Sequence, residues 1–228
     1  MSEPSELNRL VEVMARLRGL GGCPWDAEQT HASLVRYLIE ETAELVEAIE
    51  TGDAAGMREE LGDVLYQVLF HADLAAATPG EGFDVQDVAR DTAAKMIGRH
   101  PHVFGDAAAA DADAVVEVWE AQKRREKADR VSVLDGVPMQ MPSLLLAEKL
   151  VGRAARAGLE LRPLERPETV DPSTGSGHRV AAAAEEALGD ALLQTVVDSA
   201  ARGLDAERAL RGALRRLTER IREAESCR

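Results

Sequence analysis

Two clusters of acidic residues stand on either side of a single glycine, at spacings that place carboxylates on one face of a helix. The clusters comprise Glu40, Glu41 and Glu44 before the glycine, and Glu60 and Asp63 after it. Between them lies Gly52-Asp53. Because glycine commonly ends a helix and aspartate commonly begins one, this pair predicts a tight turn between two helices. In such an antiparallel hairpin, residues equally far from Gly52 lie level with each other.

The predicted hairpin brings carboxylates together. Glu44 faces Glu60 and Glu41 faces Asp63, roughly 12 Å from the turn at about 1.5 Å per residue. Carboxylates crowded in this way repel one another and resist joint ionisation. A divalent cation removes that penalty, and an oxygen-only ligand set favours Mg²⁺, with Mn²⁺ as a substitute, over zinc. Glu40, rotated by about 100° on the helix, lies at the edge of this cage, where it could orient or deprotonate a bound water.

An anionic substrate would also need cations, and two further predicted helices carry them. Lys95 and Arg99 lie one turn apart on one helix, and Lys123 follows Trp119 by one turn on another. Lys and Arg suit phosphate oxygens, and a Trp ring can stack on a base or sugar. Each also has a structural interpretation, since the cations could complement a helix C-terminus and the ring could simply pack.

Composition favours an all-α protein of one or two domains. Hydrophobic residues make up 45% of the 228 residues but aromatic residues only 3%, which suits closely packed helices better than a sheet. The net charge of −14 argues against nucleic acid or an anionic membrane surface as the main partner. With only Cys23 and Cys227, and no apolar run of membrane-spanning length, the expectation is a soluble protein in a reducing cytoplasm.

Apolar residues recur at helical spacing along nearly the whole chain, and no strand is predicted. Glycine, proline and capping residues bound the expected helices. They cover about 4–19, 27–51, 54–77, 85–99, 111–129, 142–158, 179–202 and 205–225. Thr30 or Asp26 caps the second of them. A loop is expected at 100–105 and a flexible Pro-, Gly-, Ser- and Thr-rich connection at 160–178.

An internal repeat links the two halves. The run Leu61–Gln67 matches Leu188–Gln194, and the helix that opens at Asp84 matches the one that opens at Asp205. The second copy is degenerate, because Ala187 replaces Glu60 and the first acidic cluster has no counterpart. We therefore expect a catalytic domain over 1–130, a connecting helix over 131–159 and a degenerate second repeat over 160–228.

Five short motifs give the chain a family resemblance. They are CPWDAEQT at 23–30, EETAE at 40–44, EELGD at 59–63, HPHVF at 100–104 and VWEAQK at 118–123. Together they resemble the MazG family of nucleoside triphosphate pyrophosphohydrolases, which is all-α. The resemblance implies a MazG-like helical bundle whose antiparallel helix hairpin carries the acid cluster.

The resemblance also implies an activity and a set of roles. The activity is hydrolysis of NTPs or dNTPs to the monophosphate and pyrophosphate, by a homodimer. Mg²⁺ would be held by the acids at 41, 44, 60 and 63, and Glu40 would position the attacking water. The nucleotide would be contacted by Lys95, Arg99, Trp119 and Lys123.

Two alternatives stay open. One is a narrower pyrophosphohydrolase for dUTP or phosphoribosyl-ATP. The other is a catalytically idle regulatory or interaction module whose acids bind metal only structurally, which the degenerate second copy makes plausible. Since that copy lacks its acids, any activity must come from the N-terminal half.

Overall fold

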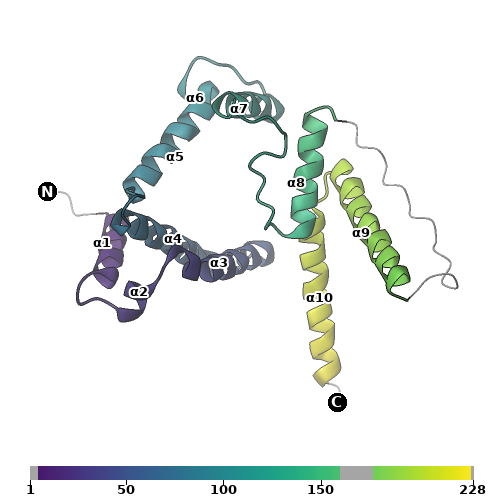
Figure 1. Cartoon of the computed structure of the whole chain (residues 1–228), viewed down its shortest axis with the longest axis horizontal. Coiled ribbons are helices and arrows are strands. Elements are labelled where there is room, and N and C mark those ends of the chain that lie inside the picture. The colour runs from purple at the N-terminus through teal and green to yellow at the C-terminus, as the bar shows by residue number, and fades with distance from the viewer. Residues whose placement is uncertain (1–4, 160–176, 227–228) are drawn as a thin grey trace. The chain divides into compact units, whose positions relative to one another are not determined.

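The computed structural model describes residues 5–159 and 177–226, with side chains described from 182 onward in the second of these ranges. The described part contains ten helices and no strand, which confirms the all-α prediction (Figure 1). The helices are α1 (Glu6–Arg18), α2 (Pro24–Glu28), α3 (His31–Thr51), α4 (Ala54–Ala77), α5 (Val85–Arg99), α6 (Pro101–Phe104), α7 (Ala112–Glu126), α8 (Ser143–Arg156), α9 (Gly177–Ala201) and α10 (Ala206–Ser226). Among them, none combines the length and apolar character that a membrane crossing demands.

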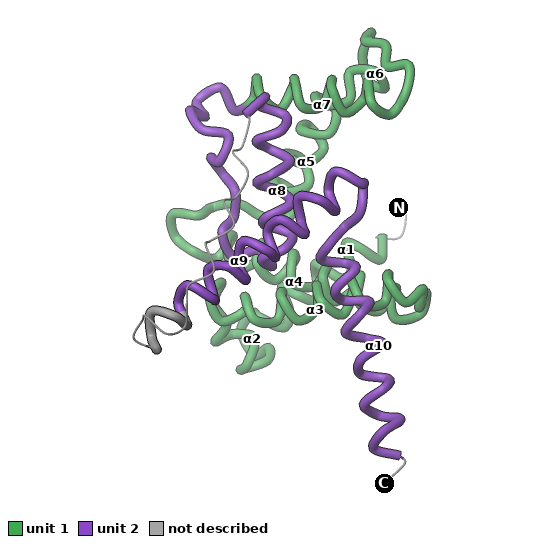
Figure 2. Tube along the Cα trace, turned by 90° about the vertical axis from the view of Figure 1, so that its right-hand side faces the viewer, with its two compact units in different colours: residues 1–126 green, residues 127–228 purple. Residues whose placement is uncertain are grey.

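The chain divides into two compact units, residues 1–126 and 127–228 (Figure 2). In the second unit α8, the predicted connecting helix, packs against α9 and α10. Arg153 of α8 donates hydrogen bonds to the carbonyl oxygens of Val133 (2.7 Å) and Asp135 (3.0 Å), which ties the preceding loop to this helix. Most of the predicted connection at 160–178, and Cys227, lie outside the described residues. That this unit is a degenerate repeat of the first stays a prediction.

A small apolar core sits where α1, α3 and α4 meet in the first unit. Phe70 of α4 is fully buried at its centre. The other buried members are Met14, Leu34, Leu69 and Leu74. Because three of these five side chains belong to α4, the core fixes which face of that helix turns inward.

The turn between α3 and α4 has the geometry that the sequence predicts. Gly52 ends α3 in the left-handed region, at φ 74°, and its N–H donates to the carbonyl oxygens of Ala48 and Ile49. A side chain with a Cβ adopts this conformation only with strain. The Asp53 carboxylate then accepts hydrogen bonds from the N–H groups of Ala55 (3.1 Å) and Gly56 (3.0 Å) and so caps α4. The two long helices pack against each other as the predicted antiparallel hairpin.

The entry to α3 differs from the predicted single helix over 27–51. Pro24–Glu28 forms the separate short helix α2, and α3 begins at His31 under a capping box formed by Thr30 and Ser33. Thr30 is therefore the cap, while Asp26 is buried and accepts a hydrogen bond from the Tyr66 hydroxyl (3.3 Å). A second local difference lies at 100–105, where the predicted loop contains the short helix α6.

Arg18 and Asp26 tie α1 and α2 to α4. Arg18 Nε donates to Asp73 Oδ2 at 2.5 Å, and Arg18 Nη1 donates to the carbonyl oxygen of Asp26 at 3.4 Å. Burial, followed by the charge and hydrogen bond of Asp26, raises the pKa of Tyr66 to about 12. On α4 these contacts are made by Tyr66, about one turn past Asp63, and Asp73, nearly three turns past it. They therefore help to set the rotation of the helix that carries half of the acidic cluster.

A histidine pair fastens the start of α3 to α4. His31 Nδ1 and His71 Nδ1 lie 2.7 Å apart with nearly parallel rings, and His31 Nε2 lies 3.0 Å from Glu81 Oε2. Two nitrogens at this distance share one proton, because two protonated rings would repel each other. Burial and the neighbouring His31 lower the pKa of His71.

This lowered pKa predicts that acid weakens the fold. Below the ordinary histidine value of about 6.5 the unfolded chain binds a proton that folded His71 resists, so unfolding becomes more favourable. The stabilising contribution is complete above that value and is lost as the pH falls through the lower folded-state pKa. Urea unfolding between about pH 8 and pH 5 should show a steeper loss of stability in the wild type than in His71→Phe. Equal slopes in the two proteins would contradict this assignment.

Candidate metal centre

The α3–α4 hairpin brings three carboxylates together. Glu41 of α3 and Glu60 and Asp63 of α4 can each offer one oxygen so that all three oxygens lie within 4.8 Å of one another. Ligand oxygens around an octahedral Mg²⁺ are about 3 to 4 Å apart, given bonds of about 2.0–2.1 Å. The spacing therefore fits a shared divalent cation with a small contraction of the side chains.

The electrostatics of this cluster also fit a cation. Burial, then the charges of Asp63, Glu44 and Glu40, raises the pKa of Glu41. Burial raises the pKa of Glu60 as well, followed by the charges of Glu44, Asp63, Glu41 and Glu59. In addition, Glu60 Oε2 is buried and has no hydrogen-bond partner in the described part of the chain. Both observations describe acids that are costly to ionise alone and that a divalent cation would stabilise.

The remaining two predicted acids lie at the rim. Glu44 is exposed and outside the group of three, although its charge is the largest electrostatic influence on the pKa of Glu60 after burial. Glu40 is exposed too, with its Oε1 atom 3.9 Å from Arg36 Nη2. The structure thus brings three of the four predicted ligands within 4.8 Å of one another, while Glu44 and Glu40 are exposed beside them.

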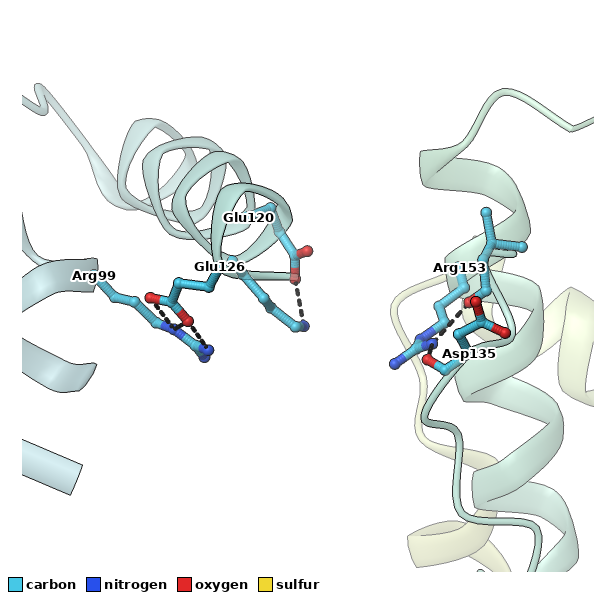
Figure 3. A network of polar contacts seen from close by, with 7 residues as sticks. Arg99, Glu120, Glu126, Asp135 and Arg153 are labelled. Atoms are coloured by element: carbon cyan, nitrogen blue, oxygen red, sulfur yellow. Dashed lines mark hydrogen bonds and ion pairs between the residues drawn. The ribbon is translucent and has the colours of Figure 1, made fainter. Parts of the chain in front are cut away.

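The predicted nucleotide-contacting residues gather at the junction of α5 and α7. Arg99 is 9% exposed and donates from Nε to both carboxylate oxygens of Glu126 (3.2 and 3.0 Å; Figure 3). Its guanidinium also lies over the Trp119 ring. Lys123 Nζ lies 3.2 Å from Glu120 Oε1. Lys95 is exposed. Arg99 and Lys123 are therefore each paired with a carboxylate of α7 in this structure.

This group lies apart from the acidic cluster within one chain. Figure 1 shows α5 leading away from the α3–α4 hairpin, and the only substantial helix packing of α7, among the described residues, is against α5. The structure therefore does not bring Arg99, Trp119 or Lys123 against Glu41, Glu60 and Asp63.

One buried residue on the same face of α4 as Asp63 has no predicted role. Gln67 of α4 is 6% exposed, and its Oε1 atom has no hydrogen-bond partner among the described residues. Its spacing offered a signal, because it follows Asp63 by one helical turn on the same face.

Fold and site define a class: an all-α protein with a carboxylate cage suited to a divalent cation. Residues 29–104 match the MazG nucleotide pyrophosphohydrolase domain. The nucleoside triphosphate pyrophosphohydrolase of Escherichia coli K12 is 37% identical over 97% of this chain and 88% of its own length. The nucleoside triphosphate pyrophosphohydrolase/pyrophosphatase MazG of Thermotoga maritima is 36% identical over 95% of this chain and 84% of its own. An uncharacterised protein of Streptomyces cacaoi is 45% identical over 95% of this chain and 81% of its own. The chain belongs to the MazG family.

Proposed function

We propose that this protein hydrolyses nucleoside and deoxynucleoside triphosphates to the monophosphate and pyrophosphate, and so clears unwanted nucleotides from the cellular pool. The convergence of Glu41, Glu60 and Asp63 is the observation that carries this proposal. The pyrophosphohydrolase names of the relatives from Escherichia coli and Thermotoga maritima support it.

Glu41, Glu60 and Asp63, with Glu44 at the rim, would hold Mg²⁺, or Mn²⁺ in its place. When bound, the ion would neutralise phosphate oxygens and lower the pKa of a coordinated water. The oxygen of water attacks the α-phosphorus, the bond from that phosphorus to the α,β-bridging oxygen breaks, and pyrophosphate leaves. Glu40, exposed beside Glu41, would orient the water, accept its proton and release it to solvent.

The α5–α7 junction would supply the nucleotide contacts. Lys95 is exposed and would meet phosphate oxygens, while Arg99 and Lys123 would exchange Glu126 and Glu120 for phosphate. Trp119 would pack on the base or sugar. Since this junction lies apart from the acidic cluster in one chain, we propose that it acts in a homodimer, in which a second subunit completes the site.

Two apolar stripes support the homodimer. They run along α3 and α4 and stay exposed in the single chain. Their members are Val35, Ile39, Ile49, Met57, Leu61, Leu65 and Val68. Exposed apolar side chains gathered on neighbouring helices are typical of a surface that packs against another protein.

Pyrophosphate release from a panel of NTPs and dNTPs tests the proposed function. We expect equal amounts of monophosphate and pyrophosphate with Mg²⁺, no turnover in EDTA, and recovery when Mg²⁺ is added in excess, because the carboxylates alone cannot neutralise the phosphates. Turnover of several bases would support a broad house-cleaning role. Turnover of dUTP or phosphoribosyl-ATP alone would point to the narrower enzyme, and silence across the panel with both Mg²⁺ and Mn²⁺ would contradict the proposal in favour of the idle module.

A further inference from the structure

Gln67 of α4 has a buried amide oxygen that no described residue satisfies. Its side chain is 6% exposed, and its Oε1 atom is buried without a hydrogen-bond partner in the described part of the chain. Buried amide oxygens in proteins almost always have a partner, either in the protein or in a bound water. A residue that departs from this rule, next to a cluster of acids, points to a ligand.

Helix geometry directs the Gln67 amide toward the acidic cluster. Glu60, Asp63 and Gln67 are spaced i, i+3 and i+7, so they form one stripe along α4. Long side chains on a helix lean toward its N-terminus, which brings the Gln67 amide over the turn that carries Asp63.

On the opposite helix, the Glu41 side chain leans toward the Gln67 amide. Glu41 and Asp63 are equally far from the turn at Gly52, and their carboxylates lie in the same group of three. Because α3 runs antiparallel to α4, the Glu41 side chain leans toward the level of Gln67. The amide and the Glu41 carboxylate therefore approach the same point between the helices.

We infer that Gln67 is a further member of the metal centre, whose amide oxygen accepts a hydrogen bond from a water on the divalent cation held by Glu41, Glu60 and Asp63. This rests on the metal site of the proposed function. A neutral amide suits the position, because it fixes a coordinated water without adding a fourth negative charge to acids that already repel one another. Gln67 is a positioning residue and does not itself touch the reacting phosphorus.

The matching residue of the second copy behaves differently. Gln194 is exposed, and its Nε2 atom donates to Asp198 Oδ1 at 2.8 Å. Its helix carries Ala187 where α4 carries Glu60. Where the acids are missing, the amide is exposed and bonded to its own helix, so Gln194→Leu is a control for the same change of residue away from the metal centre.

Mn²⁺ binding to the full-length, metal-free chain tests this inference without relying on activity. The free Mn²⁺ signal in electron paramagnetic resonance gives the affinity of the wild type, Gln67→Leu and Gln194→Leu. We expect Gln67→Leu to bind Mn²⁺ about 10-fold more weakly, the effect typical of losing a group that orients a metal's ligands. Gln194→Leu should bind like the wild type.

A second readout separates this role from general damage to the fold. In EDTA, Gln67→Leu should melt at a higher temperature than the wild type, because leucine replaces a buried unsatisfied amide. With Mn²⁺ added, the rise in melting temperature should be smaller than in the wild type. Unchanged Mn²⁺ affinity in Gln67→Leu, or a lower melting temperature in EDTA, would overturn the inference.

The outcomes also distinguish this inference from the proposed function. If Mn²⁺ binding depends on Gln67 but the wild type releases no pyrophosphate, the proposed activity is wrong and the metal centre stands. If Gln67→Leu releases pyrophosphate and binds Mn²⁺ with wild-type affinity, the proposed activity stands and Gln67 is not part of the metal centre.

Discussion

Replacing Glu41 by glutamine or Asp63 by asparagine should abolish pyrophosphate release. Each change keeps the size of the side chain but removes a charge from the group of three oxygens that lie within 4.8 Å of one another. Losing several kcal/mol of charge stabilisation by the metal corresponds to a rate loss of about a thousandfold or more. Steady-state pyrophosphate release at saturating Mg²⁺ measures this loss.

The same variants should remain folded. Burial and the neighbouring negative charges both raise the pKa of Glu41. A neutral glutamine at this position therefore relieves charge repulsion in the metal-free protein. Helical circular dichroism should persist, and the melting temperature in EDTA should equal or exceed that of the wild type. Asp190→Asn, the matched change in the predicted second repeat, should keep wild-type turnover. Wild-type rates in Glu41→Gln or Asp63→Asn would show that the proposed site is wrong.

Placing a charge on the apolar stripe of α3 should dissociate the proposed homodimer. Ile39 is 64% exposed in the single chain and lies on the same helix as Glu41. A lysine at this position would have to be buried in the interface without a partner, which costs several kcal/mol. Sedimentation equilibrium of Ile39→Lys should give the mass of one chain at concentrations where the wild type gives that of two. Pyrophosphate release should fall as the dimer dissociates, because the nucleotide contacts would come from the second subunit.

Leu7→Lys is the control for this experiment. Leu7 is 54% exposed on α1, outside the α3–α4 stripes, so it tests the effect of a new surface lysine alone. This variant should keep the mass and turnover of the wild type. A wild type that sediments as a single chain while turning over nucleotides would contradict the homodimer and leave the metal centre intact.

The part of the fold that could be predicted from sequence is the part that local signals specify. Gly52 and Asp53 act through their own backbone, one in the left-handed region and the other as a cap, so the turn follows from the residues themselves. Helical spacing then places Glu41, Glu60 and Asp63 without knowledge of the rest of the chain. The separate helix α2 could not be predicted in this way, because Asp26 is held by Tyr66, which lies 40 residues further along.

The sequence by itself therefore determined the all-helical class, the hairpin and the face on which its acids lie, since caps and helical periodicity depend on residues close in the chain. Only the tertiary structure decided which polar groups are buried and which are paired. Gln67 is buried, Glu44 is exposed, and Arg99 forms an ion pair with Glu126. These outcomes depend on how α1, α3 and α7 pack against their neighbours. Packing brings together residues that are far apart in the sequence, and no local pattern predicts such contacts.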